Sequence, residues 1–229
     1  MRSLLFCICL TVPQSLQACD LAIAFAVDVS GSVSPSEYQI QMTGLANGLR
    51  DSVVSEALVR AQAAVTVVQW TGSSRQAVSI PWTRVRSHED LEALAVQVAE
   101  TNRKWRNFST AIGEAMAFAG DTFIEVSDCR RRVIDVSGDG SSNEGIVPTK
   151  THKALLSADI TVNALVIEGS EPGLTAYFWK NVIVGPEAFV VTANGFEEYA
   201  ERMREKLTRE TAKSVSMNLQ DLMFTRLPE

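Results

Sequence analysis

Asp28-Val29-Ser30-Gly31-Ser32 follows an apolar run at residues 21–27 and precedes Ser34-Pro35-Ser36-Glu37. The apolar run is short and has no polar face, which is typical of a buried central strand. Ser34 and Glu37 match a capping box and Pro35 occupies the first helical position, so a helix begins here. A carboxylate and two hydroxyls therefore lie between a strand and a helix, where open α/β sheets bind ligands.

The side chains of this loop supply oxygen donors. Asp28 offers a carboxylate, and Ser30 and Ser32 offer hydroxyls. Hard cations such as Mg²⁺ are bound in proteins by oxygen ligands in near-octahedral geometry. Aspartate and serine are also common turn formers, because their side chains hydrogen-bond to nearby backbone groups. The loop alone therefore leaves a metal site and an ordinary turn as alternatives.

Strands alternate with helices along the rest of the chain. The patterns predict strands at residues 21–27, 64–70, 75–82, 133–137, 160–167 and 188–192, and helices at residues 35–52, 88–98, 110–123, 148–158, 174–182 and 196–207. This order predicts an α/β fold with an open, mostly parallel sheet of about six strands and helices on both faces. Residues 64–70 and 75–82 form a hairpin that adds one antiparallel edge strand, which is compatible with Pro81.

Length and charge limit the function. The chain has 229 residues, a net charge of -6 and 46% hydrophobic residues. This fits one domain of about 200 residues with a substantial core. Nonspecific nucleic-acid binding needs a basic surface, so the acidic balance argues against a nucleic-acid partner.

The amino-terminal segment differs from the rest of the chain. Arg2 is its only charge, an apolar run covers residues 4–12, and a polar break ends at Ala18. The run is too short to span a bilayer and is typical of a signal peptide. We predict a signal peptide at residues 1–18, a domain at residues 19–209, a C-terminal tail at residues 210–229, and no transmembrane segment in the mature chain.

Export to the periplasm or secretion follows from this signal. Residues 16–19 also resemble the bacterial lipobox, in which Cys19 would be lipidated. Against that alternative, the first strand begins within two residues of Cys19 and leaves no tether between lipid and fold.

The loop and the element order together resemble the von Willebrand factor type A domain over about residues 20–207. Asp28, Ser30 and Ser32 resemble the Asp-x-Ser-x-Ser core of its metal-ion-dependent adhesion site. Thr110 opens a helix after a basic loop, and Asp139 follows a strand, at the places where the family has its remaining ligands. Two positions depart from the family pattern: Phe108-Ser109 replaces a frequent Gly-Gly, and Gly138 replaces a frequent threonine.

The resemblance implies a metal site built from Asp28, Ser30, Ser32, Thr110 and Asp139, holding Mg²⁺ or else Mn²⁺ or Ca²⁺. Two carboxylates would leave a divalent ion near neutral, so it could still attract an acidic side chain of a protein partner. The implied function is binding rather than catalysis. Residues 133–140 also resemble an uncharacterised bacterial group of exported type A-like proteins.

An enzyme is the alternative. The loops at Asp28 and Asp139 also resemble those of haloacid-dehalogenase-type phosphotransferases, in which Asp28 would be the nucleophile and Asp139 would hold Mg²⁺. Against this, Lys150 and Lys153 follow the second loop instead of preceding it, and the cap insertions of that family are absent.

A disulfide between Cys19 and Cys129 is expected from the register of the two aspartate-bearing strands. Cys19 lies nine residues before Asp28, and Cys129 lies ten before Asp139. If these strands are parallel neighbours, as in the family, both cysteines reach the same opposite end of the sheet. Neighbouring strands are about 4.8 Å apart, close to the Cα separation of a disulfide. An oxidising compartment favours the bond.

Overall fold

The structure, a computed structural model, describes residues 19–169 and 171–224, except for the side chains of residues 213–224. The predicted signal peptide at residues 1–18 lies outside these residues. The strands are β1 (Leu21–Asp28), β2 (Ala64–Trp70), β3 (Gln76–Arg84), β4 (Arg131–Gly138), β5 (Ile160–Ile167) and β6 (Val190–Ala193). The helices are α1 (Pro35–Arg50), α2 (Ser52–Arg60), α3 (His88–Glu100), α4 (Ile112–Thr122), α5 (His152–Ser157), α6 (Leu174–Asn181) and α7 (Tyr199–Phe224), with short 3-10 helices at Phe123–Val126, Pro148–Lys150 and Phe196–Glu198.

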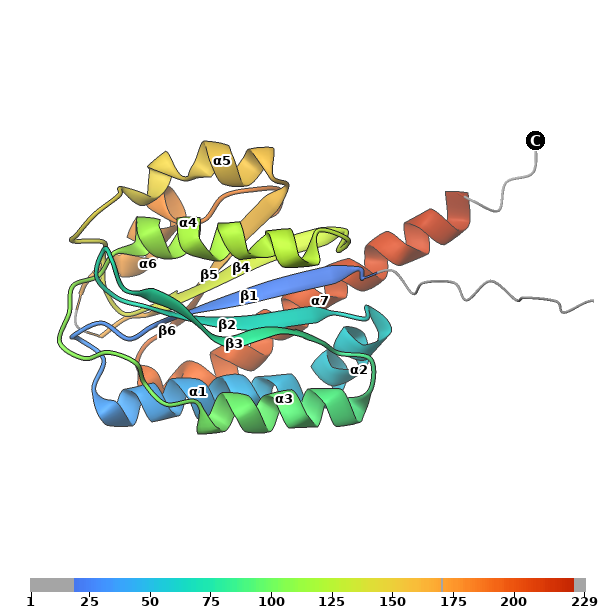
Figure 1. Cartoon of the computed structure of the whole chain (residues 1–229), viewed down its shortest axis with the longest axis horizontal. Helices are drawn as coiled ribbons and strands as arrows, with labels where there is room; N and C mark the ends of the chain where they lie inside the picture. The colour runs from blue at the N-terminus through green and yellow to red at the C-terminus, as the bar shows by residue number, and fades with distance from the viewer. Residues whose placement is uncertain (1–18, 170, 225–229) are drawn as a thin grey trace, which may run out of the picture.

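The six strands form one sheet in the order β3-β2-β1-β4-β5-β6 (Figure 1). Every neighbouring pair is parallel except β2 and β3, which are antiparallel. The predicted open, mostly parallel sheet with one antiparallel edge strand is therefore confirmed. β1 lies between β2 and β4 and is buried along its whole length, as its continuous apolar sequence predicts.

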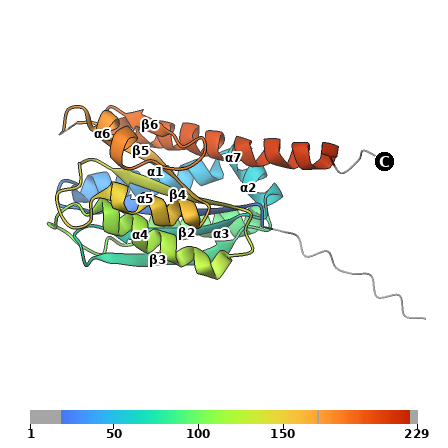
Figure 2. The same ribbon diagram turned by 90° about the horizontal axis from the view of Figure 1, so that it is seen from above.

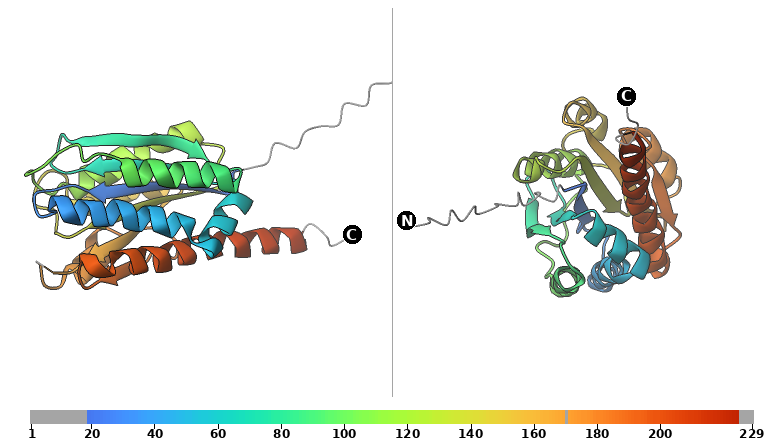
Figure 3. Two further views of the ribbon diagram at one scale, coloured as in Figure 1. Left: turned by 90° about the horizontal axis from the view of Figure 1, so that it is seen from below. Right: turned by 90° about the vertical axis from the view of Figure 1, so that its right-hand side faces the viewer.

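Helices cover both faces of the sheet. Figure 1 shows α4 and α5 on one side and α1 and α3 on the other, and Figure 2 shows α7 running beside α1. Each face has its own apolar cluster: Phe25 and Leu45 belong to one, and Ala24 and Met116 to the other. The end-on view in Figure 3 shows the sheet between these two layers.

The start of α1 follows the predicted chemistry. Ser34 Oγ accepts a hydrogen bond from the backbone N–H of Glu37, while the Glu37 carboxylate accepts one from the N–H of Ser34. This capping box fixes the point at which the loop after β1 turns into helix. The side chains at residues 28–32 are thereby held at the carboxyl edge of the sheet.

The final helix extends further than the sequence pattern indicates. α7 continues through Arg209, where the predicted domain ended, to Phe224. Glu210 is fully buried and accepts a hydrogen bond from Lys206 Nζ, so the helix remains part of the fold beyond that boundary. Within the described residues, no helix is both long and apolar enough to cross a membrane.

Candidate metal centre

β1 and β4 bring the two predicted aspartates to one edge of the sheet. The strands are parallel neighbours, with Val27 paired to Ser137. Asp28 is the last residue of β1, and Asp139 directly follows β4. Both carboxyl groups are almost completely buried, at 0% and 4% exposure. Because parallel strands end at the same edge, this juxtaposition follows from the topology alone.

Hydrogen bonds connect four of the five predicted ligands. The backbone N–H of Ser30 donates to Asp28 Oδ1 over 2.7 Å. Ser30 Oγ and Ser32 Oγ lie 3.1 Å apart, and Ser32 Oγ donates to Asp139 Oδ1 over 2.6 Å. The donors from the two loops therefore form one continuous polar cluster.

Thr110 reaches the same region from the loop before α4. Its backbone N–H donates to Asn143 Oδ1 over 2.9 Å, and its carbonyl accepts from the N–H of Asn143 over 2.9 Å. Thr110 Oγ1 lies 3.9 Å from the position that a Cβ on Gly140 would take. The hydroxyl is thus next to the residue that follows Asp139, although no hydrogen bond joins it to the other four side chains within the described residues.

One oxygen of Asp28 has no partner. Asp28 Oδ2 is buried and makes no hydrogen bond to any described residue. Burial of an unpaired carboxylate oxygen is costly, so such an atom calls for an explanation. A bound cation would satisfy it, and the set of two carboxylates and three hydroxyls matches the oxygen ligands of Mg²⁺, Mn²⁺ or Ca²⁺. The residues present therefore fit a divalent cation.

The pKa values of both carboxyl groups in the cluster are raised above their ordinary values. Burial raises the pKa of Asp28 to about 7, with a further rise from the charge of Asp139, while hydrogen bonds from Ser30 and the charge of Arg103 lower it. Burial also raises the pKa of Asp139, against a lowering by the Ser32 hydrogen bond. A cation bound between the two carboxyl groups would lower both pKa values, because its positive charge favours the ionised carboxylates.

Arg103 supports the loop, and the sequence analysis did not single it out. Its guanidinium donates to the carbonyls of Val29, Ser30 and Val33 over 2.7–2.9 Å. These bonds hold the backbone that carries the hydroxyl donors, while the carboxylates keep no direct bond to the arginine. The available signal was a loop, residues 101–108, with three cations and no acidic residue.

The two positions that depart from the family pattern both lie against the first loop. A Cβ on Gly138 would lie 3.2 Å from Asp28 Oδ2, with the rings of Phe178 and Trp70 3.5 and 3.6 Å away. A Cβ at this position would therefore be tight against the Asp28 carboxylate, while its distances to the two rings are ordinary van der Waals contacts. Phe108 accepts a hydrogen bond at its carbonyl from the N–H of Gly31 over 2.8 Å, which ties the loop before α4 to the first loop.

The donor set differs from that of a site built from several histidine, cysteine or acidic side chains. Among the described residues, no three His, Cys, Asp or Glu side chains lie close enough together to hold a metal ion. This agrees with a centre whose ligands are mostly hydroxyls. Lys150 and Lys153, considered above for a phosphotransferase, are both exposed.

A disulfide joins Cys19 to Cys129 at the opposite edge of the sheet, with the Cα atoms 4.5 Å apart. The two cysteines are separated by 110 residues, the same offset that pairs Leu21 of β1 with Arg131 of β4. The bond therefore continues the strand register past the amino ends of the two strands that carry Asp28 and Asp139.

Solved structures with the same fold include several von Willebrand factor type A domains. Proximal thread matrix protein 1 from the mussel byssus superposes with a TM-score of 0.65 at 17% identity, over 83% of this chain and 47% of that one. A second structure of that protein, with a zinc-occupied MIDAS motif, gives 0.63 at 16% identity, over 85% and 46%. At these identities the similarity establishes the fold alone.

Two bacterial structures are similar in the same way. A von Willebrand factor type A protein from Catenulispora acidiphila gives a TM-score of 0.58 at 18% identity, over 86% of this chain and 43% of that one. The pilus adhesin SpaC from Lactobacillus rhamnosus GG gives 0.61 at 11% identity, over 86% and 30%. This chain thus spans less than half the length of each of these proteins.

Comparison of the sequence with curated proteins gives no match. A family model does match residues 18–215, and its description is "Protein of unknown function (DUF1194)". This match covers most of the chain, including all of the candidate ligands. The chain therefore belongs to the DUF1194 family, and its fold is that of a von Willebrand factor type A domain.

Proposed function

We propose that this protein is an exported, non-enzymatic binding module that recognises a protein partner through a divalent cation. Asp28, Ser30, Ser32, Thr110 and Asp139 would hold the ion, which we expect to be Mg²⁺, with Mn²⁺ or Ca²⁺ as substitutes. The observation that carries the proposal is the buried, unpartnered Oδ2 of Asp28 within a cluster of oxygen donors.

Charge balance supports binding of an acidic group. Asp28 and Asp139 together would neutralise a divalent cation, and the hydroxyls add no further charge. An ion held this way keeps affinity for one more anionic oxygen, so a Glu or Asp side chain of a partner could complete its coordination. The hydroxyl of Ser32 is on an exposed residue, which leaves the outer side of the cluster open to solvent.

The structural neighbours are consistent with this proposal. The mussel protein carries a zinc-occupied MIDAS motif, and the SpaC protein is a pilus adhesin. The mussel protein supports a divalent-cation site in this fold, and the SpaC protein supports an adhesive role.

The phosphotransferase alternative has less support. Asp28 is completely buried, which is unfavourable for a nucleophile that must reach a phosphoryl group. Lys206 is also buried, where it contacts Asp135 and Glu210 and is unavailable for a phosphate. We therefore expect no phosphatase turnover with Mg²⁺.

Export is supported by the chemistry of Cys19. A disulfide with Cys129 fits an oxidising compartment, as expected for a periplasmic or secreted protein. A sulfur already bonded to Cys129 has no free thiol for lipid attachment, so the disulfide argues against a lipoprotein. Mass spectrometry of the exported protein would distinguish the two, because a diacylglyceryl adduct on Cys19 excludes the bond.

Calorimetry with Mn²⁺ and Mg²⁺ tests the metal site. Wild-type protein should bind one ion, and Asp28→Asn should abolish binding. Asp121→Asn, which neutralises an exposed aspartate on α4, should bind like wild type. Equal binding by wild type and Asp28→Asn would refute the site. Capture of a partner from envelope extract should then be lost on addition of chelator and in the Asp28 variant.

A further inference from the structure

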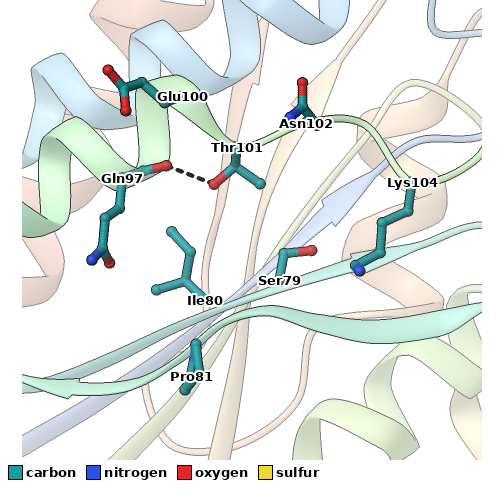
Figure 4. A pocket seen from close by; sticks show the side chains of 8 residues that line it. All are labelled: Ser79, Ile80, Pro81, Gln97, Glu100, Thr101, Asn102 and Lys104. Carbon is teal, nitrogen blue, oxygen red and sulfur yellow. Dashed lines mark hydrogen bonds between the residues drawn. The ribbon is translucent and has the colours of Figure 1, made fainter.

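A second concave site lies away from the metal centre, between the edge strand β3 and the segment that follows α3. It has a volume of about 530 Å³ and is lined by residues of both segments (Figure 4). This volume lies in the range of small-molecule sites, about 300–1,000 Å³. Its floor is apolar and comes from Ile80 and Pro81, and its rim is polar and includes Ser79, Asn102 and Lys104.

A β-bulge positions Ser79 in this pocket. Val68 pairs with Val78 and Val67 pairs with Ile80, so Ser79 has no partner residue on β2. Such bulges redirect a side chain, and they are over-represented next to functional sites. Ser79 Oγ is buried but makes no hydrogen bond to any described residue, and Figure 4 shows it pointing toward the ammonium of Lys104.

The ammonium of Lys104 at the rim is available to bind a ligand. Lys104 is exposed and forms no ion pair within the described part of the chain, whereas its neighbour Arg103 is bonded to three backbone carbonyls of the first loop. Residues 101–108 contain three cations and no acidic residue. In Figure 4 the carboxylate of Glu100, the acidic lining residue, points away from the centre of the pocket.

The wall of the pocket is pre-formed. The backbone N–H of Lys104 donates to Gln69 Oε1 over 2.8 Å, and Gln69 Nε2 donates to the carbonyl of Asn102 over 2.9 Å. Gln69 is itself fully buried in β2. These bonds fix the backbone on both sides of Arg103, so a ligand would not have to order this loop.

The edge of β3 is unsuited to an added peptide strand. Pro81 lies within the strand and lacks an N–H, and the pairing with β2 is interrupted by two register shifts. Both features block edge-to-edge pairing. The occupant must therefore be recognised by side chains, with an apolar part over the floor and an anionic part at the rim.

We propose that this pocket binds a small organic carboxylate with a short aliphatic chain. The carboxylate accepts hydrogen bonds from Lys104 Nζ and Ser79 Oγ, and the aliphatic chain covers Ile80 and Pro81. The ligand gives Ser79 Oγ the hydrogen-bond partner that it lacks among the described residues. This site is independent of the metal centre, so either proposal can fail alone.

Hexanoate is a suitable probe, with hexanamide as its neutral counterpart and acetate as an anion without the chain. Titration of ¹⁵N-labelled protein with hexanoate should shift the backbone amide signals of Ser79, Asn102 and Lys104. Hexanamide and acetate should each bind at least about tenfold more weakly, since each lacks one of the two recognised features. Equal binding of hexanamide, or hexanoate shifts confined to other regions, would overturn the proposal.

Three variants locate the binding. Lys104→Gln should weaken hexanoate at least about tenfold and Ser79→Ala about fivefold, since one removes a charge-assisted bond and the other a neutral donor. Lys104→Arg should retain binding, and Lys150→Gln, at another exposed lysine, should match wild type. Circular dichroism checks folding. Unchanged affinity in folded Lys104→Gln, or an equal loss in Lys150→Gln, would contradict the proposed site.

Discussion

Two groups of buried acidic side chains lie along this sheet, and they differ in the source of the compensating charge. At the metal centre, Asp28 and Asp139 have no lysine or arginine bonded to their carboxylates among the described residues. In the second group, which we call the buried ion cluster, Asp135 of β4 lies with Lys206 and Glu210 of α7. Lys206 Nζ is 2.5 Å from Asp135 Oδ2 and 2.7 Å from Glu210 Oε1, and all three residues are at most 1% exposed.

The difference indicates how each group is completed. The buried ion cluster contains its own ammonium, and Asn163 adds a hydrogen bond to Glu210 over 3.0 Å. At the metal centre the charge that acts on both carboxylates is that of Arg103, whose hydrogen bonds go to backbone carbonyls instead. The buried ion cluster therefore has its compensating charge within the chain, whereas the candidate metal centre would receive it from the cation that we propose. Substitutions should affect the two with opposite sign.

The largest effect is expected from Lys206→Met. This change leaves Asp135 and Glu210 buried without their cation, which destabilises proteins by about 3–5 kcal/mol. Burial lowers the pKa of Lys206, but the charges of Asp135 and Glu210 outweigh this and raise the pKa overall, so the ammonium is charged in the folded state. Urea unfolding with and without the substitution measures the loss.

A matched control separates charge from general disruption. Lys180 is an exposed lysine at the end of α6, and Lys180→Met should change stability by less than about 0.5 kcal/mol. A loss below about 1 kcal/mol in Lys206→Met would mean that the two carboxyl groups do not need the ammonium. The contrast between the two acidic groups would then disappear.

The opposite sign is expected for Asp28→Asn in metal-free protein. Ionising a buried carboxyl whose pKa is raised from 3.8 to about 7 costs stability at pH 8, so its neutral isostere should be more stable by up to about 4 kcal/mol. With Mn²⁺ at a hundredfold excess over its dissociation constant, wild type should gain about 2.7 kcal/mol and the variant nothing.

Thermal unfolding at pH 8, with chelator and with Mn²⁺, gives both quantities in one experiment. Asp121→Asn should follow wild type under both conditions, because that aspartate is exposed. A metal-free Asp28→Asn protein that is less stable than wild type would show that the carboxylate is satisfied without a cation.

The pH dependence of stability should show the same contrast. The pKa of Asp28 is raised from 3.8 to about 7, so the folded chain binds this proton more tightly than the unfolded chain. Metal-free stability should therefore fall as the pH rises from about 4 to about 7. Asp28→Asn should flatten this slope, and saturating Mn²⁺ should remove it by displacing the proton. If wild type and Asp28→Asn showed the same change of melting temperature between about pH 4 and pH 7, the raised pKa of Asp28 would be contradicted.

Much of the fold could be predicted because its signals are local. The buried run before Asp28, the capping box at Ser34 and the alternation of strands and helices fixed the order and direction of the elements. Helix α2 was missed, because the first helix was predicted to end at residue 52 and no element was assigned between residues 53 and 63. The Asp51 carboxylate starts α2 by accepting hydrogen bonds from the N–H groups of Val53 and Val54. This helix has nine residues and buries only Val54 and Leu58, so its apolar pattern is too short to be recognised by spacing.

The end of the final helix was misplaced, because its charged residues look solvent-exposed in the sequence. Lys206 and Glu210 are charged residues at i,i+4 spacing, a pattern typical of a solvent-exposed helix face. Their partner Asp135 lies about seventy residues earlier in the sequence, within a strand that reads as apolar. Only the sheet topology brings them together, so sequence periodicity ended the helix at residue 207, three residues before the buried Glu210.

The candidate site was easier to predict than the contacts that support it. Asp28, Ser30, Ser32, Thr110 and Asp139 were singled out by motif and by position at strand ends, and the structure gathers them at one edge. Arg103 and Asn143 hold the loops through backbone groups. Any long polar side chain could form hydrogen bonds to backbone groups, so no residue pattern predicts these contacts.

The smallest effect is expected from Ser32→Ala, which tests whether hydroxyls as well as carboxylates hold the ion. Ser32 lies at the exposed side of the cluster, and its Oγ donates to Asp139 Oδ1 over 2.6 Å. Removing this hydroxyl takes away one neutral ligand but no charge, so Mn²⁺ affinity should fall about tenfold, equivalent to about 1.4 kcal/mol. Stability without metal should fall by about 1 kcal/mol, because Asp139 Oδ1 loses a hydrogen-bond donor. Ser74→Ala, at another exposed serine, should bind Mn²⁺ like wild type. A Ser32 variant with wild-type affinity would show that this hydroxyl is not a ligand. A variant that lost binding as completely as Asp28→Asn would show that the hydroxyl does more than complete the coordination.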